Sequence, residues 1–372
     1  MIIGVPKEIK LQEHRIGLTP DSVKILNDKG HEVLVQNNGG FEAGFTNEDY
    51  EKSGAKIIEK AEDIFKSAEI IVKVKEPQMN EVKMIRENQI IYTYLHLAAA
   101  KELTEGLVKS KSVCIAYETV TDDDGKLPLL APMSAVAGRM SIQAGAHSLE
   151  KNQNGRGLLL GGAPGVEPAN VVILGGGVVG ENAAIIATGM RGKVYVVDKS
   201  KERLKELHKM FGDKIIPTES DNTDLNKLVS ECDLLVGGVL IPGAEAPKLI
   251  TKEMIKNMKR GSVVVDVAID QGGCVETSKP TTHANPTYLV DEVVHYCVAN
   301  MPGGVPRTST MALNKATLPF LIKLADQGYK KTLQEDKNYL AGLNVYKGKI
   351  TYKGVADAFD LEYFSAEKAL SE

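Results

Sequence analysis

The segment from Ala169 to Asp198, ANVVILGGGVVGENAAIIATGMRGKVYVVD, constrains the fold of this chain most strongly. Gly175, Gly177 and Gly180 spell G-x-G-x-x-G directly after an apolar run and at the start of a helical pattern. A second apolar run ends in Asp198, roughly 20 residues further on, as a dinucleotide-binding βαβ unit requires. The first glycine permits a tight turn, the second lets the backbone approach a pyrophosphate, and the third allows close helix–strand packing.

Asp198 also predicts which dinucleotide is bound. A carboxylate at the end of the second strand accepts hydrogen bonds from ribose hydroxyls and repels a 2′-phosphate, so it favours NAD over NADP. Lys199, Lys201 and Arg203 lie beside it, which leaves some use of NADP open. The alternative interpretation of the motif is a glycine-rich βα turn that binds no ligand.

Composition excludes several classes of protein. The chain has 372 residues, enough for two domains, and 43% are hydrophobic, so it is not disordered. A net charge of −4 provides no basic field for nucleic acid or an anionic membrane. We find neither a secretory signal nor an apolar stretch of about 18 residues, and we expect a cytoplasmic protein. The cysteines show no metal-ligand or disulfide spacing, which fits a reducing compartment: Cys114, Cys232, Cys274 and Cys297.

Alternating strand and helix patterns predict the fold class. Apolar runs at 2–5, 31–35, 56–58, 69–74, 89–95 and 112–117 alternate with helical segments, and a second alternation places strands at 171–174, 193–197, 233–236 and 262–268. We predict an α/β protein with two Rossmann-like domains, each with a parallel sheet, separated by a cleft. Residues 1–128 and 307–372 form the substrate or catalytic domain, and residues 129–306 the NAD-binding domain. The segment 134–151, rich in small residues, is predicted to be a helix packed closely against another helix or another chain.

Polar side chains at predicted strand ends are the candidates for chemistry, because ligands of open α/β sheets bind beyond the carboxyl ends of the strands. They are Arg15, Lys75, His96 and Asp270. Each also has a structural interpretation: His96 as an ordinary surface or core histidine, Asp270 as a cap, and Arg15 as a surface cation. Asp266 is a second candidate acid that a buried structural role would equally explain.

The chain resembles the alanine dehydrogenase family along essentially its full length. The runs that carry the resemblance are EHRIGLTP, KVKEP, YLHLAAA, AYETV, LPLLAPMSAVAGR, GGAPGVEPANVVILGGGVVG, GAEAPKLI, DVAIDQGGC, YCVANMPGGVP and TSTMALNKAT. Several of these runs have no part in generic nucleotide binding, so the match is more specific than the glycine motif. The NAD-binding domain of proton-translocating transhydrogenase and, more distantly, saccharopine dehydrogenase share the architecture.

The resemblance implies an NAD-dependent amino-acid dehydrogenase that converts L-alanine reversibly into pyruvate, ammonium and NADH. By motif, Arg15 and Lys75 bind the substrate, and His96 and Asp270 are the acid–base residues. The resemblance also implies a homohexamer, whereas the sequence alone supports only an oligomer of unstated size. No metal is predicted, because Lys323 and Gln327 are unconvincing ligands. The implied cofactor contacts, together with the motif glycines, are Ser134, Gly175, Gly177, Val178, Val179, Gly180, Asp198, Arg203, Ser220, Val239, Leu240, Val267, Ala268, Ile269, Asp270, Lys279, Val298, Ala299, Asn300 and Met301.

Two other functions remain open from the sequence: a soluble NAD(H)-binding subunit of the transhydrogenase type and a non-catalytic NAD sensor. The set of strand-end residues argues against both, because binding a dinucleotide requires none of them. Turnover of glycine, serine, 2-aminobutyrate or glyoxylate also stays open, because one methylene or hydroxyl changes affinity by only about 1–3 kcal/mol.

Overall fold

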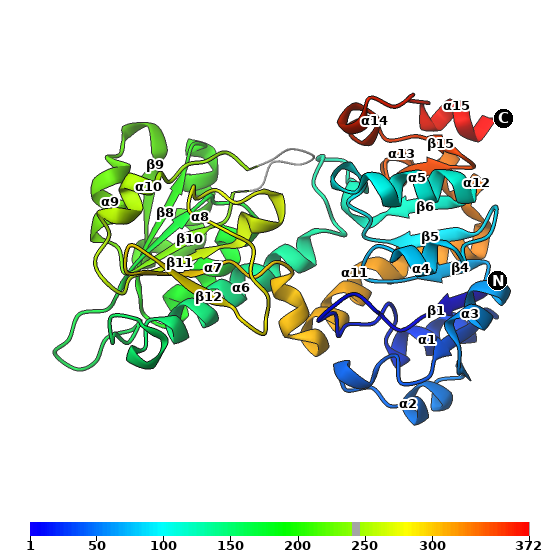
Figure 1. Ribbon diagram of the computed structural model, residues 1–372, viewed down its shortest axis with the longest axis horizontal. Helices are drawn as coiled ribbons and strands as arrows, with labels where there is room; N and C mark the ends of the chain where they lie inside the picture. Colours follow the sequence, from blue (N-terminus) through cyan, green and yellow to red (C-terminus); the bar gives the residue numbers. More distant parts are fainter. Residues whose placement is uncertain (240–245, 372) are drawn as a thin grey trace. The chain divides into compact units, whose positions relative to one another are not determined.

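A computed structural model describes residues 1–239 and 246–371 (Figure 1). The chain forms two compact units, and each is described by itself. Unit 1 combines Met1–Pro132 with the segment from Gly303 onward, and unit 2 is Met133–Pro302. Within the described residues, no helix combines the length and apolar character that a membrane crossing needs.

Unit 1 is built around a mostly parallel sheet. In spatial order its strands are β3 (Lys56–Ile58), β2 (Glu32–Gln36), β1 (Ile2–Val5), β4 (Ile70–Val72), β5 (Ile90–Thr93), β6 (Val113–Ala116), β14 (Leu343–Tyr346) and β15 (Lys349–Ile350). The strands from β3 to β6 are parallel, whereas β14 lies antiparallel to β6 and β15 antiparallel to β14. The C-terminal part of the chain therefore extends the sheet formed by the N-terminal part.

Helices cover both faces of this sheet. They are α1 (Pro20–Asp28), α2 (Asn47–Lys52), α3 (Ala61–Ser67), α4 (Met79–Val82), α5 (Lys101–Ser110), α11 (Pro306–Gln327), α12 (Tyr329–Glu335), α13 (Lys337–Leu340), α14 (Lys353–Phe359) and α15 (Ala366–Ser371). The side chains of Phe65 and Leu107, from α3 and α5, pack with Ile91 on one face. On the other face the hydroxyl of Tyr92 donates to the carbonyl of Thr317 in α11.

Unit 2 contains a second sheet of the same kind. Its strands, in spatial order, are β9 (Ile215–Glu219), β8 (Lys193–Asp198), β7 (Asn170–Leu174), β10 (Leu234–Gly237), β11 (Val263–Asp266), β13 (Val293–Tyr296) and β12 (Thr287–Val290). All pairs are parallel except β12 with β13. Both sheets thus follow the doubly wound order of a Rossmann fold. The predicted fold class is confirmed, with the correction that each sheet carries an antiparallel edge.

The helices of unit 2 are α6 (Ala131–Ser148), α7 (Val178–Gly189), α8 (Lys201–Phe211), α9 (Leu225–Glu231) and α10 (Lys252–Lys256). The small residues of α6 pack within this unit. A Cβ added to Gly138 would lie 2.2 Å from the carbonyl oxygen of Val179, and one added to Gly145 would lie 2.6 Å from the Leu234 side chain. At these two glycines α6 therefore packs closely against α7 and the sheet of the same unit, in agreement with the predicted close packing against another helix.

Candidate functional site

The strand order places a ligand-binding edge in each unit. The order reverses between β1 and β4 in unit 1 and between β7 and β10 in unit 2. Ligands of such sheets bind beyond the carboxyl ends of the strands at that point. Arg15 lies in the loop after β1, Lys75 in the loop after β4, and His96 shortly after β5. Unit 1 therefore brings these three predicted residues to the ends of three neighbouring strands.

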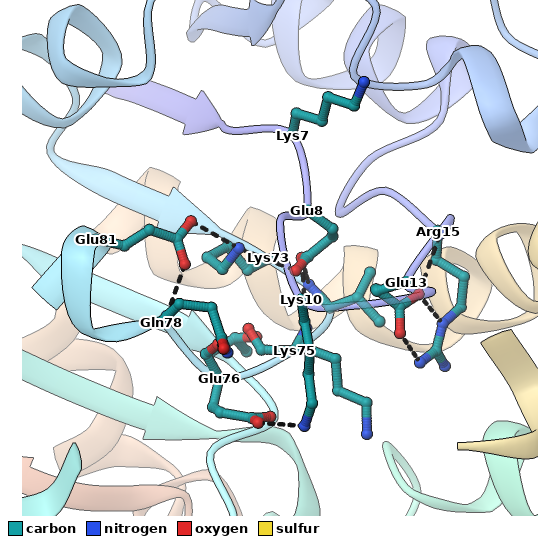
Figure 2. Close-up of polar contacts among 12 residues, drawn as sticks. Lys7, Glu8, Lys10, Glu13, Arg15, Lys73, Lys75, Glu76, Gln78 and Glu81 are labelled. Atoms are coloured by element: carbon teal, nitrogen blue, oxygen red, sulfur yellow. Dashed lines mark hydrogen bonds and ion pairs between the residues drawn. The ribbon is translucent and has the colours of Figure 1, made fainter. Parts of the chain in front are cut away.

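Arg15 is buried, with an exposed fraction of 2%. Its Nε and Nη2 donate to the two carboxylate oxygens of Glu13, each at 2.6 Å, and the Glu13 side chain is itself fully buried (Figure 2). Burial alone would lower the pKa of the guanidinium, but the bonds to Glu13 raise it above its ordinary value. The interpretation of Arg15 as a surface cation is therefore wrong, and Glu13 fixes the orientation of the guanidinium plane.

Glu8 organises the segment that carries Lys75. Because β4 ends at Val72, the lysine nearest the strand is Lys73, which is completely buried between the carboxylates of Glu8 at 2.9 Å and Glu81 at 3.0 Å (Figure 2). The second oxygen of Glu8 accepts the backbone N–H groups of Val74 and Lys75, at 2.6 and 3.3 Å. Burial raises the pKa of Glu8, although the neighbouring Lys73 opposes that shift. Lys73 is therefore a structural residue, and Lys75 lies in the loop beyond the strand.

His96 lies at the end of the next strand. Its backbone is left-handed, with φ of 49° and ψ of 40°, and its side chain is 48% exposed. The His96 N–H donates to the carboxylate of Glu118 at 2.6 Å. The imidazole stacks on the ring of Tyr94, with ring centroids 5.8 Å apart. The imidazole thus lies on a fixed backbone and is accessible to solvent.

The glycine motif of unit 2 has the geometry that phosphate binding requires. Gly175 has φ of +91°, which side chains rarely allow, and a Cβ on Gly180 would lie 1.8 Å from the carbonyl oxygen of Gly175. Nothing lies within 4 Å of a Cβ placed on Gly177, at the start of α7. The turn therefore packs tightly against Gly180 and is open at Gly177, on the side where a phosphate would meet the helix N-terminus.

Asp198 faces this turn. Its Oδ2 accepts the N–H of Gly176 at 2.6 Å, and its Oδ1 accepts the N–H of Ser200 at 2.8 Å. Arg203 donates to the carbonyl of Gly176 at 2.7 Å and pairs with Glu181 and Glu206. The carboxylate that predicts NAD thus lies against the glycine turn, and Arg203 beside it pairs with glutamates.

Asp266 and Asp270 have different environments. Asp266 is completely buried and accepts the N–H of Ala268 at 3.1 Å and the hydroxyl of Ser278 at 2.6 Å. This is the structural role that the sequence left open for it. Asp270, in the short 3-10 helix η7 (Val267–Gln271), is exposed, and its Oδ1 accepts the N–H of Asn300 at 3.2 Å. Asp266 therefore shapes the turn on which Asp270 is presented.

The remaining cofactor candidates lie on several elements of unit 2. Asp270 joins the predicted segments 267–270 and 298–301, since it bonds to Asn300. Val298 and Met301 are buried in the core of the unit, so their side chains serve packing. Leu240 lies outside the described residues. The other positions are in the first turn of α6, after β9, after β10 and in the segment before β12: Ser134, Ser220, Val239 and Lys279.

Sequence reasoning missed the carboxylates that hold the candidate residues. Glu8 and Glu13 follow β1, and Glu118 follows β6 directly. The rule that selected the cations and the histidine, polar side chains just beyond strand ends, applies equally to these acids. A signal was therefore present, although their partners were not readable from it.

Comparison with known families gives two matches. Residues 4–137 match the model described as "Alanine dehydrogenase/PNT, N-terminal domain", and residues 141–353 match "Alanine dehydrogenase/PNT, C-terminal domain". Together the two models cover most of the chain.

Individual relatives extend this similarity over the full length. An alanine dehydrogenase from Halomonas elongata is 57% identical over 366 residues, covering 98% of this chain and 99% of the relative. A solved structure named L-alanine dehydrogenase has a TM-score of 0.93 and 50% identity, with 97% of this chain and 99% of that chain covered. The crystal structure of a transhydrogenase from Sinorhizobium meliloti has a TM-score of 0.82 at 23% identity, covering 94% and 100%, and shows a shared fold alone.

Proposed function

The chain belongs to the alanine dehydrogenase/PNT family, and on that premise we propose that it catalyses the reversible, NAD-dependent oxidative deamination of L-alanine to pyruvate, ammonium and NADH. The observation that carries the proposal is the placement of Arg15, Lys75 and His96 at the ends of three neighbouring strands. Binding a dinucleotide needs none of these groups, whereas an amino-acid dehydrogenase needs a carboxylate anchor, a cation for the carbonyl oxygen and a base.

Arg15 and Lys75 bind the substrate in this proposal. Glu13 accepts from Nε and Nη2 of Arg15, and we expect the substrate carboxylate to pair with the guanidinium that is held in this way. Because Glu13 fixes the guanidinium plane, little side-chain freedom is lost when the substrate binds. The ammonium group of Lys75 stabilises negative charge that develops on the carbonyl or carbinolamine oxygen, and one such preorganised donor contributes about 3–4 kcal/mol.

His96 acts as the proton acceptor in deamination. Its neutral imidazole takes a proton from the substrate amine or from the water that attacks the iminium carbon, and it returns the proton in the reverse direction. Asp270 is the second acid–base residue that the family resemblance implies. NAD, which the geometry of the glycine turn and of Asp198 fits, supplies the hydride acceptor when it is bound. We expect the rate of deamination to rise with pH, because a general base must be unprotonated to accept a proton, and the rate of reductive amination to fall.

The test is NADH formation, followed by absorbance, with the purified chain, NAD and a panel of L-amino acids at alkaline pH. We expect L-alanine to be the best substrate and His96→Ala to lower the rate about 10²–10⁴-fold while NADH binding stays near normal. The chain contains no tryptophan, so NADH binding can be followed by fluorescence with little background. Clear NADH binding without turnover of any amino acid would replace this proposal with a transhydrogenase-type or sensor function.

We also propose that the chain is cytoplasmic and works as a homo-oligomer, a hexamer by family resemblance. Leu159 and Val166 support association, because 70% and 60% of their surfaces are exposed in one short segment of unit 2. Light scattering on the purified chain measures the mass directly. A monomer would contradict the proposal, and Leu159→Ser is expected to weaken the assembly if this segment contributes to it.

A further inference from the structure

The backbone at His96 adopts a conformation that its sequence does not favour. Its φ of 49° and ψ of 40° are left-handed, and a residue with a Cβ rarely adopts this region because the Cβ crowds the backbone. Such a conformation persists where neighbouring groups hold it in place. Because the direction of a side chain follows from its backbone, whatever holds this turn also determines where the imidazole points.

The carboxylate of Glu118 holds the turn. Glu118 lies in the short 3-10 helix η3 (Tyr117–Thr119), directly after β6, which is the parallel neighbour of β5. One of its oxygens accepts the His96 N–H at 2.6 Å, and both oxygens lie 3.2 Å from the N–H of Leu95. Only 13% of the Glu118 side chain is exposed, so water competes little for these charge-assisted bonds. A single carboxylate thus receives two consecutive N–H groups at the end of β5.

The hydrogen bonds of Glu118 are to the backbone N–H groups and not to the imidazole. The distance from Glu118 Oε1 to His96 Nδ1 is 3.9 Å, too long for a hydrogen bond. The ring is instead restrained by Tyr94, whose plane lies within 5° of that of the imidazole and whose hydroxyl donates to the carbonyl of Leu129 at 2.5 Å. Glu118 and Tyr94 therefore restrain different parts of the same residue.

We propose that Glu118 is a positioning residue that holds the imidazole of His96 in its reactive place through the backbone of residues 95 and 96. The inference rests on the proposed function, in which His96 exchanges protons with the substrate. The length of the Glu118 side chain is critical in this proposal, because its carboxylate must extend from the end of β6 to the backbone at the end of β5. A displacement of about 1 Å at a reacting group lowers a rate by up to about 10²-fold. Substrate affinity should change little, because Glu13 holds Arg15.

Two substitutions separate reach from charge. Glu118→Gln keeps the length of the side chain and one acceptor oxygen. Glu118→Asp keeps the charge but shortens the side chain by one methylene. Glu105→Asp is the matched control, because Glu105 is exposed in the middle of α5. For each variant we would measure kcat and KM for L-alanine and for pyruvate, NADH binding by fluorescence, and Tm.

We expect Glu118→Gln to keep kcat within about fivefold, since the neutral bond is weaker but still made. Glu118→Asp should lower kcat about 10–100-fold with KM within about threefold and unchanged NADH binding. Full activity of Glu118→Asp, or a larger loss in Glu118→Gln than in Glu118→Asp, would overturn the inference. Absence of turnover by the unmodified chain would instead contradict the proposed function, so the two failures are distinguishable.

Discussion

Three of the glycines in α7 and its preceding turn, Gly177, Gly180 and Gly189, allow a sharp test of how the dinucleotide site is built. Replacing each by alanine adds the same methyl group to three different environments. A Cβ on Gly180 would lie 1.8 Å from the carbonyl oxygen of Gly175, whereas nothing lies within 4 Å of a Cβ on Gly177 or on Gly189. The geometry therefore predicts three distinct outcomes from one chemical change.

Gly180→Ala should reduce both stability and cofactor binding. Protein Cβ atoms essentially never approach another heavy atom more closely than 3.0 Å, so the start of α7 must move by about 1.2 Å away from the turn. Overpacking of this kind costs about 1–3 kcal/mol, equivalent to a fall in Tm of roughly 2–12 °C for a unit of this size. The same displacement removes the helix N-terminus from the phosphate position, so NADH binding should weaken by at least about tenfold.

Gly177→Ala should separate the two effects. Its φ of −67° suits alanine, and the space around its Cβ is open, so Tm should remain within about 1 °C. The added methyl group occupies the side from which a pyrophosphate approaches the backbone, so NADH binding should weaken strongly. Gly189→Ala is the control at the far end of the helix, with unchanged NADH binding and a gain of up to about 1 kcal/mol in helix stability.

The assays are thermal unfolding and NADH titration by fluorescence on the three variants side by side. The decisive comparisons are of Gly177→Ala with the unmodified chain and of Gly180→Ala with Gly189→Ala. If Gly177→Ala bound NADH as tightly as the unmodified chain, the phosphate would not lie at this turn. If Gly180→Ala were as stable as Gly189→Ala, the close helix–strand approach would not be a constraint.

Three further predictions follow from paired or buried charges. Asp198→Ala should weaken NADH binding about 10-fold or more and reduce the preference for NADH over NADPH. Titration with both cofactors measures this preference, and an unchanged preference would contradict the role of Asp198. Lys73→Met should lower the free energy of unfolding by about 3–5 kcal/mol, because Glu8 and Glu81 would remain buried without a cation. Chemical denaturation measures this loss. Adding Glu8→Gln and Glu81→Gln to the same variant should restore much of the lost stability. Burial lowers the pKa of His295 below its ordinary 6.5, so between pH 6.5 and that lower pKa the unfolded chain binds a proton that the folded chain does not. Stability should therefore fall as pH decreases below 6.5, by up to about 1.4 kcal/mol per pH unit, and His295→Gln should flatten Tm over the same range.

Local signals in the sequence predicted much of the secondary structure correctly. Thr19 followed by Pro20 is typical of a helix start, and α1 begins at Pro20 with the Thr19 side chain accepting the N–H of Ser22. The runs at 2–5, 56–58 and 171–174 correspond closely to β1, β3 and β7. Such signals are readable because capping, apolar alternation and glycine turns act over a few neighbouring residues.

The strands that the sequence did not indicate are edge strands or lie near an edge. β9 contains Pro217, and β12 and β13 form a short antiparallel pair. β14 pairs with β6 from a distant part of the chain, at a register interrupted between Leu343 and Val345. Their formation depends on a sheet that already exists, so their own residues carry a weak pattern.

By itself, the sequence determined the glycine turn, the acidic residue that faces it, and the strand ends at which Arg15, Lys75 and His96 lie. Tertiary structure alone decided which carboxylate holds which group. Glu8 reaches Lys73 across 65 residues, and Glu118 reaches His96 across 22. These partners meet because β1 pairs with β4 and β5 pairs with β6, and that order follows from the packing of the whole sheet. The carboxylates of Glu8 and Glu118 each hold a group that a neighbouring strand presents, so their roles are set by the fold rather than by their places in the chain.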